Sequence, residues 1–241
     1  RLRDMAEELL RIAAMRATRT AEPLSPPEGL WDEFCARFPY EETEDQLTAI
    51  DDIIGDLGAG RPMDRLICGD VGFGKTEVAL RAAFLVAMSG KQVAVVAPTT
   101  LLCRQHFRTF SERFRGLPVK VRQLSRLVTT KDANETKAAL ADGTVEIVVG
   151  THALLSKTVQ FSDLGLMIID EEQHFGVKHK ERLKDMRAEV HALTLSATPI
   201  PRTLQLALAG VREMSIIATP PIDRMAVRTY VTAFDAVTVR E

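Results

Sequence analysis

Gly69-Asp70-Val71-Gly72-Phe73-Gly74-Lys75-Thr76 fits the pattern G-x-x-x-x-G-K-[ST], which is typical of phosphate-binding loops. Residues 64–68 before it are short and apolar at their centre, which predicts a buried strand, and residues 76–85 after it carry an apolar stripe at helical spacing. Gly72 and Gly74 leave room for a phosphate, and the loop amides and the helix N-terminus present partial positive charge to it. The stretch therefore predicts a nucleotide site, in which Lys75 neutralises the outer phosphates and the Thr76 hydroxyl binds Mg²⁺. A glycine-rich turn without a ligand is the alternative that the loop alone leaves open.

The composition of the 241 residues, 46% of them hydrophobic, is sufficient for a full α/β core. The net charge is -2, so any nucleic acid would have to meet a local basic patch. Cys35, Cys68 and Cys103 are odd in number and scattered, which favours reduced thiols. Cys103 shares a predicted helix face with His106, but no second pair completes a zinc site, so we interpret both as packing residues. No apolar run has the length of a membrane span and no signal peptide is visible, so we expect a cytoplasmic protein without a membrane partner.

Strands and helices alternate along most of the chain, which predicts a parallel sheet flanked by helices on both faces. Residues 92–97 are almost continuously apolar, as a strand covered on both sides requires. The further strands are expected over residues 119–124, 145–149, 164–169, 191–195 and 215–218, and the helices over residues 43–57, 76–85, 101–114, 131–141 and 200–209.

The N-terminal residues are expected to form an extension to this lobe. Residues 1–19 show the apolar spacing of an amphipathic helix, three prolines over residues 23–27 break the chain, and an apolar anchor of Leu30, Trp31, Phe34 and Phe38 follows. We therefore divide the chain into a connector helix with its linker (1–37), a nucleotide-binding lobe (38–218) and the start of a further connection (219–241). Because the chain begins without methionine and stops in strand-like sequence, we expect a piece of a longer protein.

Thr43 and Gln46 have the spacing of a capping box at the start of a helix. That structural role explains both residues by itself. A second interpretation stays open, in which Gln46, upstream of the phosphate loop, reads the edge of an adenine.

Acidic residues follow another apolar strand, in the run Asp170-Glu171-Glu172-Gln173. The carboxyl ends of strands in open α/β sheets are where ligands bind. Nucleotide hydrolysis requires one carboxylate near Mg²⁺ and another that orients and deprotonates the attacking water. Asp170 suits the metal and Glu171 suits the water. A helix start that is rich in acids is the alternative, since the helix dipole alone favours it.

Hydroxyls and cations gather at the ends of other predicted strands. Ser196 and Thr198 follow a buried strand, where they would sense the γ-phosphate or, alternatively, cap a helix. A local basic run lies at the sheet end of Thr99, Thr100, Thr151 and His152, and this combination suits contacts to a nucleic-acid backbone rather than to bases. A solvated face without a partner is the alternative. The run contains Arg104, Arg108, Arg113, Arg115, Lys120, Arg122 and Arg126.

These motifs, in this order, resemble the first RecA-like motor lobe of superfamily 2 helicase-type ATPases, and within them the double-stranded DNA translocases that couple transcription to repair. The resemblance covers nearly the whole chain, and RecG-type fork-remodelling helicases share several of its motifs. It is carried by Phe38-Pro39-Tyr40-Glu41-Glu42-Thr43, Gly69 to Glu77, Ala97-Pro98-Thr99-Thr100-Leu101-Leu102, Gly150-Thr151-His152, Asp170 to Val177 and Leu195 to Leu204.

The resemblance implies ATP and Mg²⁺ as cofactors and double-stranded DNA as a partner. It implies RNA polymerase and excision-repair proteins as partners bound through domains outside this chain. Gln46 would contact adenine. DNA would meet Thr99, Thr100, Arg104, Arg126, Thr151 and His152, and hydrolysis would be coupled to grip through Gln173, Ser196, Thr198 and Arg202.

Two other classes of function are weighed against a motor lobe. A phosphate-loop kinase lacks support, because no acceptor-substrate pocket can be read from the sequence. A DNA clamp with a secondary ATPase stays open. A motor lobe on its own should hydrolyse nucleotide poorly, because the arginines that stabilise the transition state come from a second lobe.

Overall fold

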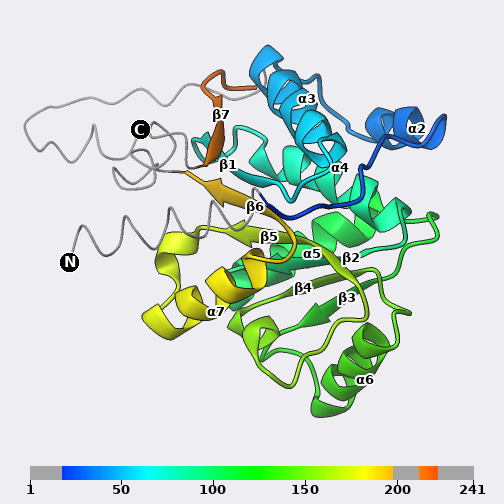
Figure 1. The fold of residues 1–241 in the computed structure, drawn as a ribbon, viewed down its shortest axis with the longest axis vertical. Helices are drawn as coiled ribbons and strands as arrows, with labels where there is room; N and C mark the ends of the chain where they lie inside the picture. Colours follow the sequence, from blue (N-terminus) through cyan, green and yellow to red (C-terminus); the bar gives the residue numbers. More distant parts are fainter. Residues whose placement is uncertain (1–17, 198–211, 222–241) are drawn as a thin grey trace, which may run out of the picture.

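The computed structural model describes residues 18–197 and 212–221, and within them a seven-stranded sheet lies between layers of helices (Figure 1). The strand order is β3-β4-β2-β5-β6-β1-β7, and every neighbouring pair is parallel. This confirms the predicted parallel α/β fold. The strands are β1 (Asp64–Gly69), β2 (Gln92–Val96), β3 (Val121–Leu124), β4 (Ile147–Gly150), β5 (Leu164–Asp170), β6 (His191–Ser196) and β7 (Glu213–Ile217).

Helices cover both faces of the sheet because successive strand residues point to opposite sides. Val95 and Ile168 belong to a core shared with α3, α4 and α5, whereas Val96 and Ile169 belong to a second core shared with α6 and α7. The helices are α2 (Leu30–Ala36), α3 (Glu44–Gly58), α4 (Lys75–Met88), α5 (Thr100–Arg113), α6 (Thr130–Ala141) and α7 (Val177–Arg187), with 3₁₀ turns η1 (His152–Leu155) and η2 (Glu172–His174).

The predicted elements that fall in the described residues are all present, with ends that differ by a few residues. The sequence does not predict helix α7, because the helix has no apolar stripe: of its 11 residues, Leu183 alone is buried. The helices expected over residues 1–19 and 200–209 lie essentially outside the described residues.

The predicted apolar anchor contributes to the core through α2. Phe34 is fully buried, and its ring stacks on Phe84 of α4 with centroids 4.3 Å apart and lies 5.1 Å from the ring of Phe114. Arg37, at the end of α2, donates to the carbonyls of Arg113 and Arg115 at 3.2 and 2.8 Å. The segment before the lobe is therefore joined to α4 and α5.

One edge of the sheet gathers the predicted site residues, because all strands run in the same direction. Cys68 pairs with Ser196, Val96 with Gly150 and Asp170 with Leu195. Gly150 is required here, since a Cβ at this position would lie 2.6 Å from the carbonyl oxygen of Leu124 in the edge strand.

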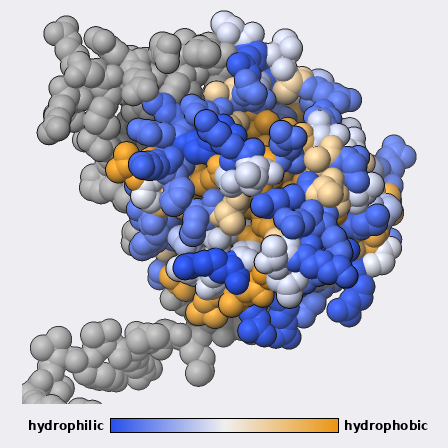
Figure 2. Space-filling model, turned by 90° about the horizontal axis from the view of Figure 1, so that it is seen from below, coloured by the Kyte–Doolittle hydropathy of each residue, from blue (hydrophilic) through white to orange (hydrophobic). Residues whose placement is uncertain are grey.

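Hydrophilic residues predominate on the face shown in Figure 2, with hydrophobic residues between them. The exposed large hydrophobic residues include Val71, Leu101 and Val177. Within the described ranges, no helix is long and apolar enough to cross a membrane.

Candidate nucleotide site

The phosphate loop connects the end of β1 to the start of α4, as the sequence predicts. Gly72 and Gly74 adopt φ values of 81° and 85°, the left-handed region that glycine enters without strain. The Asp70 carboxylate accepts from the Val71 amide at 2.7 Å and the Asp70 carbonyl accepts from the Phe73 amide at 3.2 Å, so the turn is held internally. The loop is therefore an ordered turn that leads into a helix N-terminus, a place where proteins bind anions.

Lys75 begins α4 and folds back over the loop. Its ammonium donates to the carbonyls of Gly69 at 2.6 Å and Asp70 at 3.0 Å. Burial lowers the pKa of Lys75, and the negative charges of Glu171, Asp170 and Asp70 oppose that shift. The loop lysine and the acid pair therefore lie at one edge of the sheet within electrostatic reach of each other, as a shared triphosphate requires.

Glu171 has a strained backbone and well-defined partners. Its φ of 48° makes it the one non-glycine residue of the described ranges in the left-handed region, and such strain, roughly 1–3 kcal/mol, clusters at functional sites. Its amide donates to the Leu195 carbonyl at 2.9 Å, and its carboxylate accepts from the Ala197 amide at 2.7 Å and from Gln173 Nε2. Glu171 is thus tied directly to the end of β6, where Ser196 is buried.

Asp170 ends β5 and has a buried partner that the sequence reasoning missed. His106 Nε2 lies 2.7 Å from Asp170 Oδ2, and both side chains are buried. The interpretation of His106 as a packing residue was therefore wrong. Cys103 does pack, with Sγ 3.7 Å from the Val149 carbonyl. The sequence did not reveal His106 as the partner of Asp170, because a contact between residues 64 positions apart leaves no local sequence pattern.

Gln46 serves both as a cap and as a contact to the phosphate loop. It completes the predicted capping box with Thr43, and its Nε2 donates to the carbonyl of Phe73 at 2.9 Å. A Cβ at Gly74 would displace the Gln46 amide from its contact with the loop, and the φ of 85° favours glycine at this position in any case.

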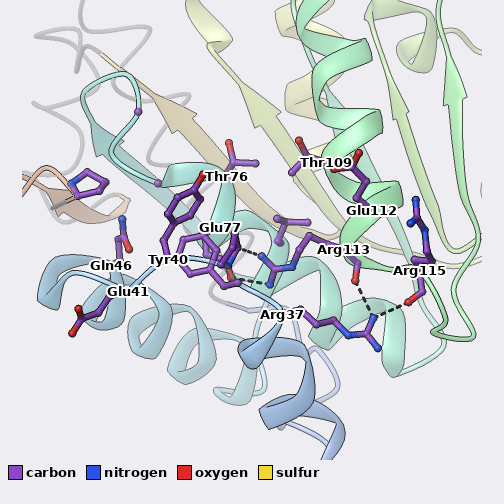
Figure 3. A pocket seen from close by; sticks show the side chains of 16 residues that line it. Arg37, Tyr40, Glu41, Gln46, Thr76, Glu77, Thr109, Glu112, Arg113 and Arg115 are labelled. Atoms are coloured by element: carbon purple, nitrogen blue, oxygen red, sulfur yellow. Dashed lines mark hydrogen bonds and ion pairs between the residues drawn. The ribbon is translucent and has the colours of Figure 1, made fainter. Parts of the chain in front are cut away.

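A cavity of about 890 Å³ opens beside this contact (Figure 3). Phe38, Pro39 and Tyr40 line it together with Gln46 and the loop side of Thr76. Charged residues, among them Glu77 and Arg113, line it as well. Pockets of this size suit small ligands such as nucleotides. The cavity adjoins the phosphate loop, where a base would lie if the phosphates occupied the loop.

A buried ion network forms part of the cavity wall. Glu77, which exposes 3% of its surface, accepts from Arg81 Nε at 2.6 Å and from both terminal nitrogens of Arg113. Arg81 also pairs with Glu42 at 2.5 Å. Arg113 is therefore not a candidate DNA contact, although it belongs to the basic run of the sequence, because its charge is paired with Glu77 inside the lobe.

The predicted DNA-facing residues differ in exposure. Arg104, Arg126 and His152 are exposed, and the Thr99 hydroxyl caps α5 by accepting from the Leu102 amide at 3.2 Å. Thr100 is half-buried.

Thr151 exposes 2% of its surface, and its hydroxyl has no hydrogen-bond partner among the described residues. The His152 ring lies 4.8 Å from the ring of His179, and burial, His179 and Arg126 lower the pKa of His152. Thr198 and Arg202 lie outside the described residues.

The residues present fit a magnesium nucleotide. Mg²⁺ usually takes one or two carboxylates, a hydroxyl, water and substrate phosphates rather than an all-protein cage. The described residues contain no group of three or more His, Cys, Asp or Glu that would form such a cage. Asp170 and the Thr76 hydroxyl supply the donors that the usual arrangement needs.

A parallel sheet with a phosphate loop on β1 and an acid pair at the end of β5 defines a phosphate-loop ATPase lobe of the helicase type. Residues 43–207 match the DEAD/DEAH box helicase family, and the chain belongs to that family. The whole chain is 54% identical to the transcription-repair-coupling factor of Rickettsia prowazekii and 51% identical to that of Escherichia coli, of which it spans 22% and 21%. A RecG structure bound to a three-way DNA junction superposes with a TM-score of 0.75 at 34% identity, over 92% of this chain and 31% of that one. These findings confirm the resemblance predicted from the motifs.

Proposed function

We propose that this chain is the first ATPase lobe of a double-stranded DNA translocase that displaces stalled RNA polymerase and promotes excision repair. The chain spans about a fifth of the length of the curated relatives it matches, and their name supplies the coupling of transcription to repair. The assignment of ATPase activity rests on one observation, which is that Lys75, Asp170 and Glu171 lie together at one edge of the sheet. RNA polymerase and repair proteins would bind through segments outside this chain, in the bacterial cytoplasm. The domain division at residues 37 and 218 belongs to the same proposal.

Each residue of the site has a task in ATP hydrolysis. Lys75 and the loop amides bind the phosphates, while Gln46 and Tyr40 border the cavity for the base. Asp170 and Thr76 would hold Mg²⁺, which neutralises charge on the phosphate oxygens when it is bound. Glu171 would orient the attacking water and accept its proton.

The coupling of hydrolysis to DNA would pass through the contacts of Glu171. Its carboxylate binds Gln173 and the amide of Ala197, beside Ser196 and next to Thr198. A change at the γ-phosphate therefore acts on the end of β6. The DNA backbone would meet the partly or fully exposed Thr99, Thr100, Arg104, Arg126 and His152, and the buried Thr151 belongs to the same proposed set.

The test is DNA-stimulated ATP hydrolysis in the full-length protein. Lys75→Ala and Glu171→Gln should each lower stimulated turnover at least about 100-fold, the usual effect of losing a charge or base at such a site. Glu171→Gln should keep ATP binding, since it leaves the phosphate loop intact. Stimulated turnover that persists in both variants would overturn the ATPase assignment. Turnover by this chain alone should be slow, because arginines that stabilise the transition state in such ATPases come from a second lobe.

A second candidate is a fork-remodelling helicase lobe, favoured by the likeness to RecG on a three-way junction. The two candidates differ in the DNA that stimulates them. Stimulation by linear duplex as strong as by a three-way junction supports the translocase, and stimulation by the junction alone supports fork remodelling.

A further inference from the structure

A buried hydrogen bond joins the predicted DNA-facing helix to the predicted magnesium ligand. His106 lies in the second turn of α5 and exposes 7% of its surface, and Asp170 exposes 8%. His106 Nε2 lies 2.7 Å from Asp170 Oδ2. The two atoms lie at hydrogen-bond distance, in a geometry that suits an imidazole N–H at Nε2 donating to a carboxylate oxygen.

This bond fixes the orientation of the Asp170 carboxylate. The terminal torsion of an aspartate is broad and has no sharp preference of its own. A donor held at Oδ2 restricts that torsion, so the carboxylate keeps one orientation in which Oδ1 is the oxygen that His106 does not bind. Hydrogen-bonded partners of metal ligands typically account for about 10- to 100-fold in metal affinity.

The helix that carries His106 also carries candidate DNA contacts. Thr99 caps α5, and Arg104, two residues before His106, is exposed to solvent. Cys103, on the buried face, contacts the carbonyl of Val149 and seats α5 on β4. A helix moves as a rigid element, so a shift at its N-terminal end displaces the His106 side chain relative to Asp170.

We infer that His106 is a positioning residue, which holds Asp170 for Mg²⁺ and makes the metal site respond to what α5 contacts. The inference rests on the proposed function, since it takes Asp170 as the ligand and duplex DNA as the partner. It adds a residue of α5 to the route from DNA to hydrolysis, separate from the route through Glu171 and β6.

The test compares two variants that differ in where they place an amide. Gln carries its Nε2 the same number of bonds from Cβ as His does, so His106→Gln should restore most of the contact. Asn ends one atom earlier, so His106→Asn should lose it. The binding of a fluorescent ADP to the full-length protein is titrated with Mg²⁺ and repeated in EDTA. His106→Asn should need about 10- to 100-fold more Mg²⁺ for half-maximal effect, while its ADP affinity in EDTA stays that of the wild type.

A second buried histidine provides the matched control. His191 begins β6, at the sheet edge away from Asp170, and its Nδ1 accepts from the Met63 amide at 2.9 Å. His191→Gln should lower thermal stability without changing the Mg²⁺ dependence. If His106→Asn does not fold, His106→Met, which keeps the side-chain volume, takes its place.

The outcomes separate the inference from the proposed function. If the wild type does not bind ADP, the proposed function fails, and the inference with it. If ADP binds but the Mg²⁺ dependence of His106→Asn equals that of the wild type, the positioning role is overturned while the proposed function stands. The same holds if the ADP affinity of His106→Asn falls as much in EDTA as it does with Mg²⁺. Duplex DNA should shift the half-maximal Mg²⁺ concentration in the wild type and not in His106→Asn, and an equal shift in both proteins would overturn the connection through α5.

Discussion

Removing the carboxylate of Glu77 should destabilise this lobe strongly. Glu77 is buried and forms ion pairs with two guanidinium groups, those of Arg81 and Arg113. Breaking a buried ion pair by removing one partner costs about 3–5 kcal/mol, because the other charge stays buried and unpaired. Arg81 keeps Glu42 and Arg113 keeps the Phe34 carbonyl, so Glu77→Ala should fall near the lower end of that range. For a domain of this size that corresponds to a drop of roughly 6–12 °C in Tm.

Thermal unfolding followed by circular dichroism measures this effect. The control is an ion pair on α5 whose two residues have the same i,i+4 spacing. Arg108 and Glu112 form an i,i+4 pair like that of Glu77 and Arg81, but their side chains are 80% and 52% exposed. Glu112→Ala should therefore leave Tm almost unchanged, because exposed pairs contribute little. Glu77→Gln, which keeps the shape and one acceptor, should fall between the two. Equal Tm values for Glu77→Ala and Glu112→Ala would refute the argument that burial makes the Glu77 pairs important.

Two further predictions concern the proposed DNA surface. Arg104→Glu combined with Arg126→Glu should weaken duplex binding and lower the slope of log K against log salt by about one unit per lost phosphate contact. Arg61→Glu, at the amino ends of the strands, is the control and should change neither the affinity nor the slope. An unchanged slope in the double variant would mean that Arg104 and Arg126 are only a solvated face. The pKa of His152 lies below its usual value of 6.5, so its ring is neutral at pH 7 and gains charge only as the pH falls through that lowered pKa. His152→Asn should therefore cost little duplex affinity at about pH 7.5 and more at about pH 5.5, and a loss that is equal at both pH values would contradict a role for the charged ring.

The phosphate loop, the acid pair and the parallel sheet were determined by the sequence alone. Each is a local pattern: the spacing of glycines around Lys75, the apolar run that ends at Asp170, and the alternation of strand and helix periods. The carboxyl ends of parallel strands share one edge of a sheet, so local patterns were sufficient to bring Lys75, Asp170 and Glu171 together.

Only the tertiary structure decided which distant side chains meet. His106 contacts Asp170 across 64 residues, Gln46 contacts the Phe73 carbonyl across 27, and Arg113 pairs with Glu77 across 36. Each contact depends on how a helix is rotated and placed over the sheet, which follows from the packing of two hydrophobic cores and not from any one segment. The sequence shows how many arginines α5 carries, but only their exposure in the structure shows that Arg113 faces inward and Arg104 outward.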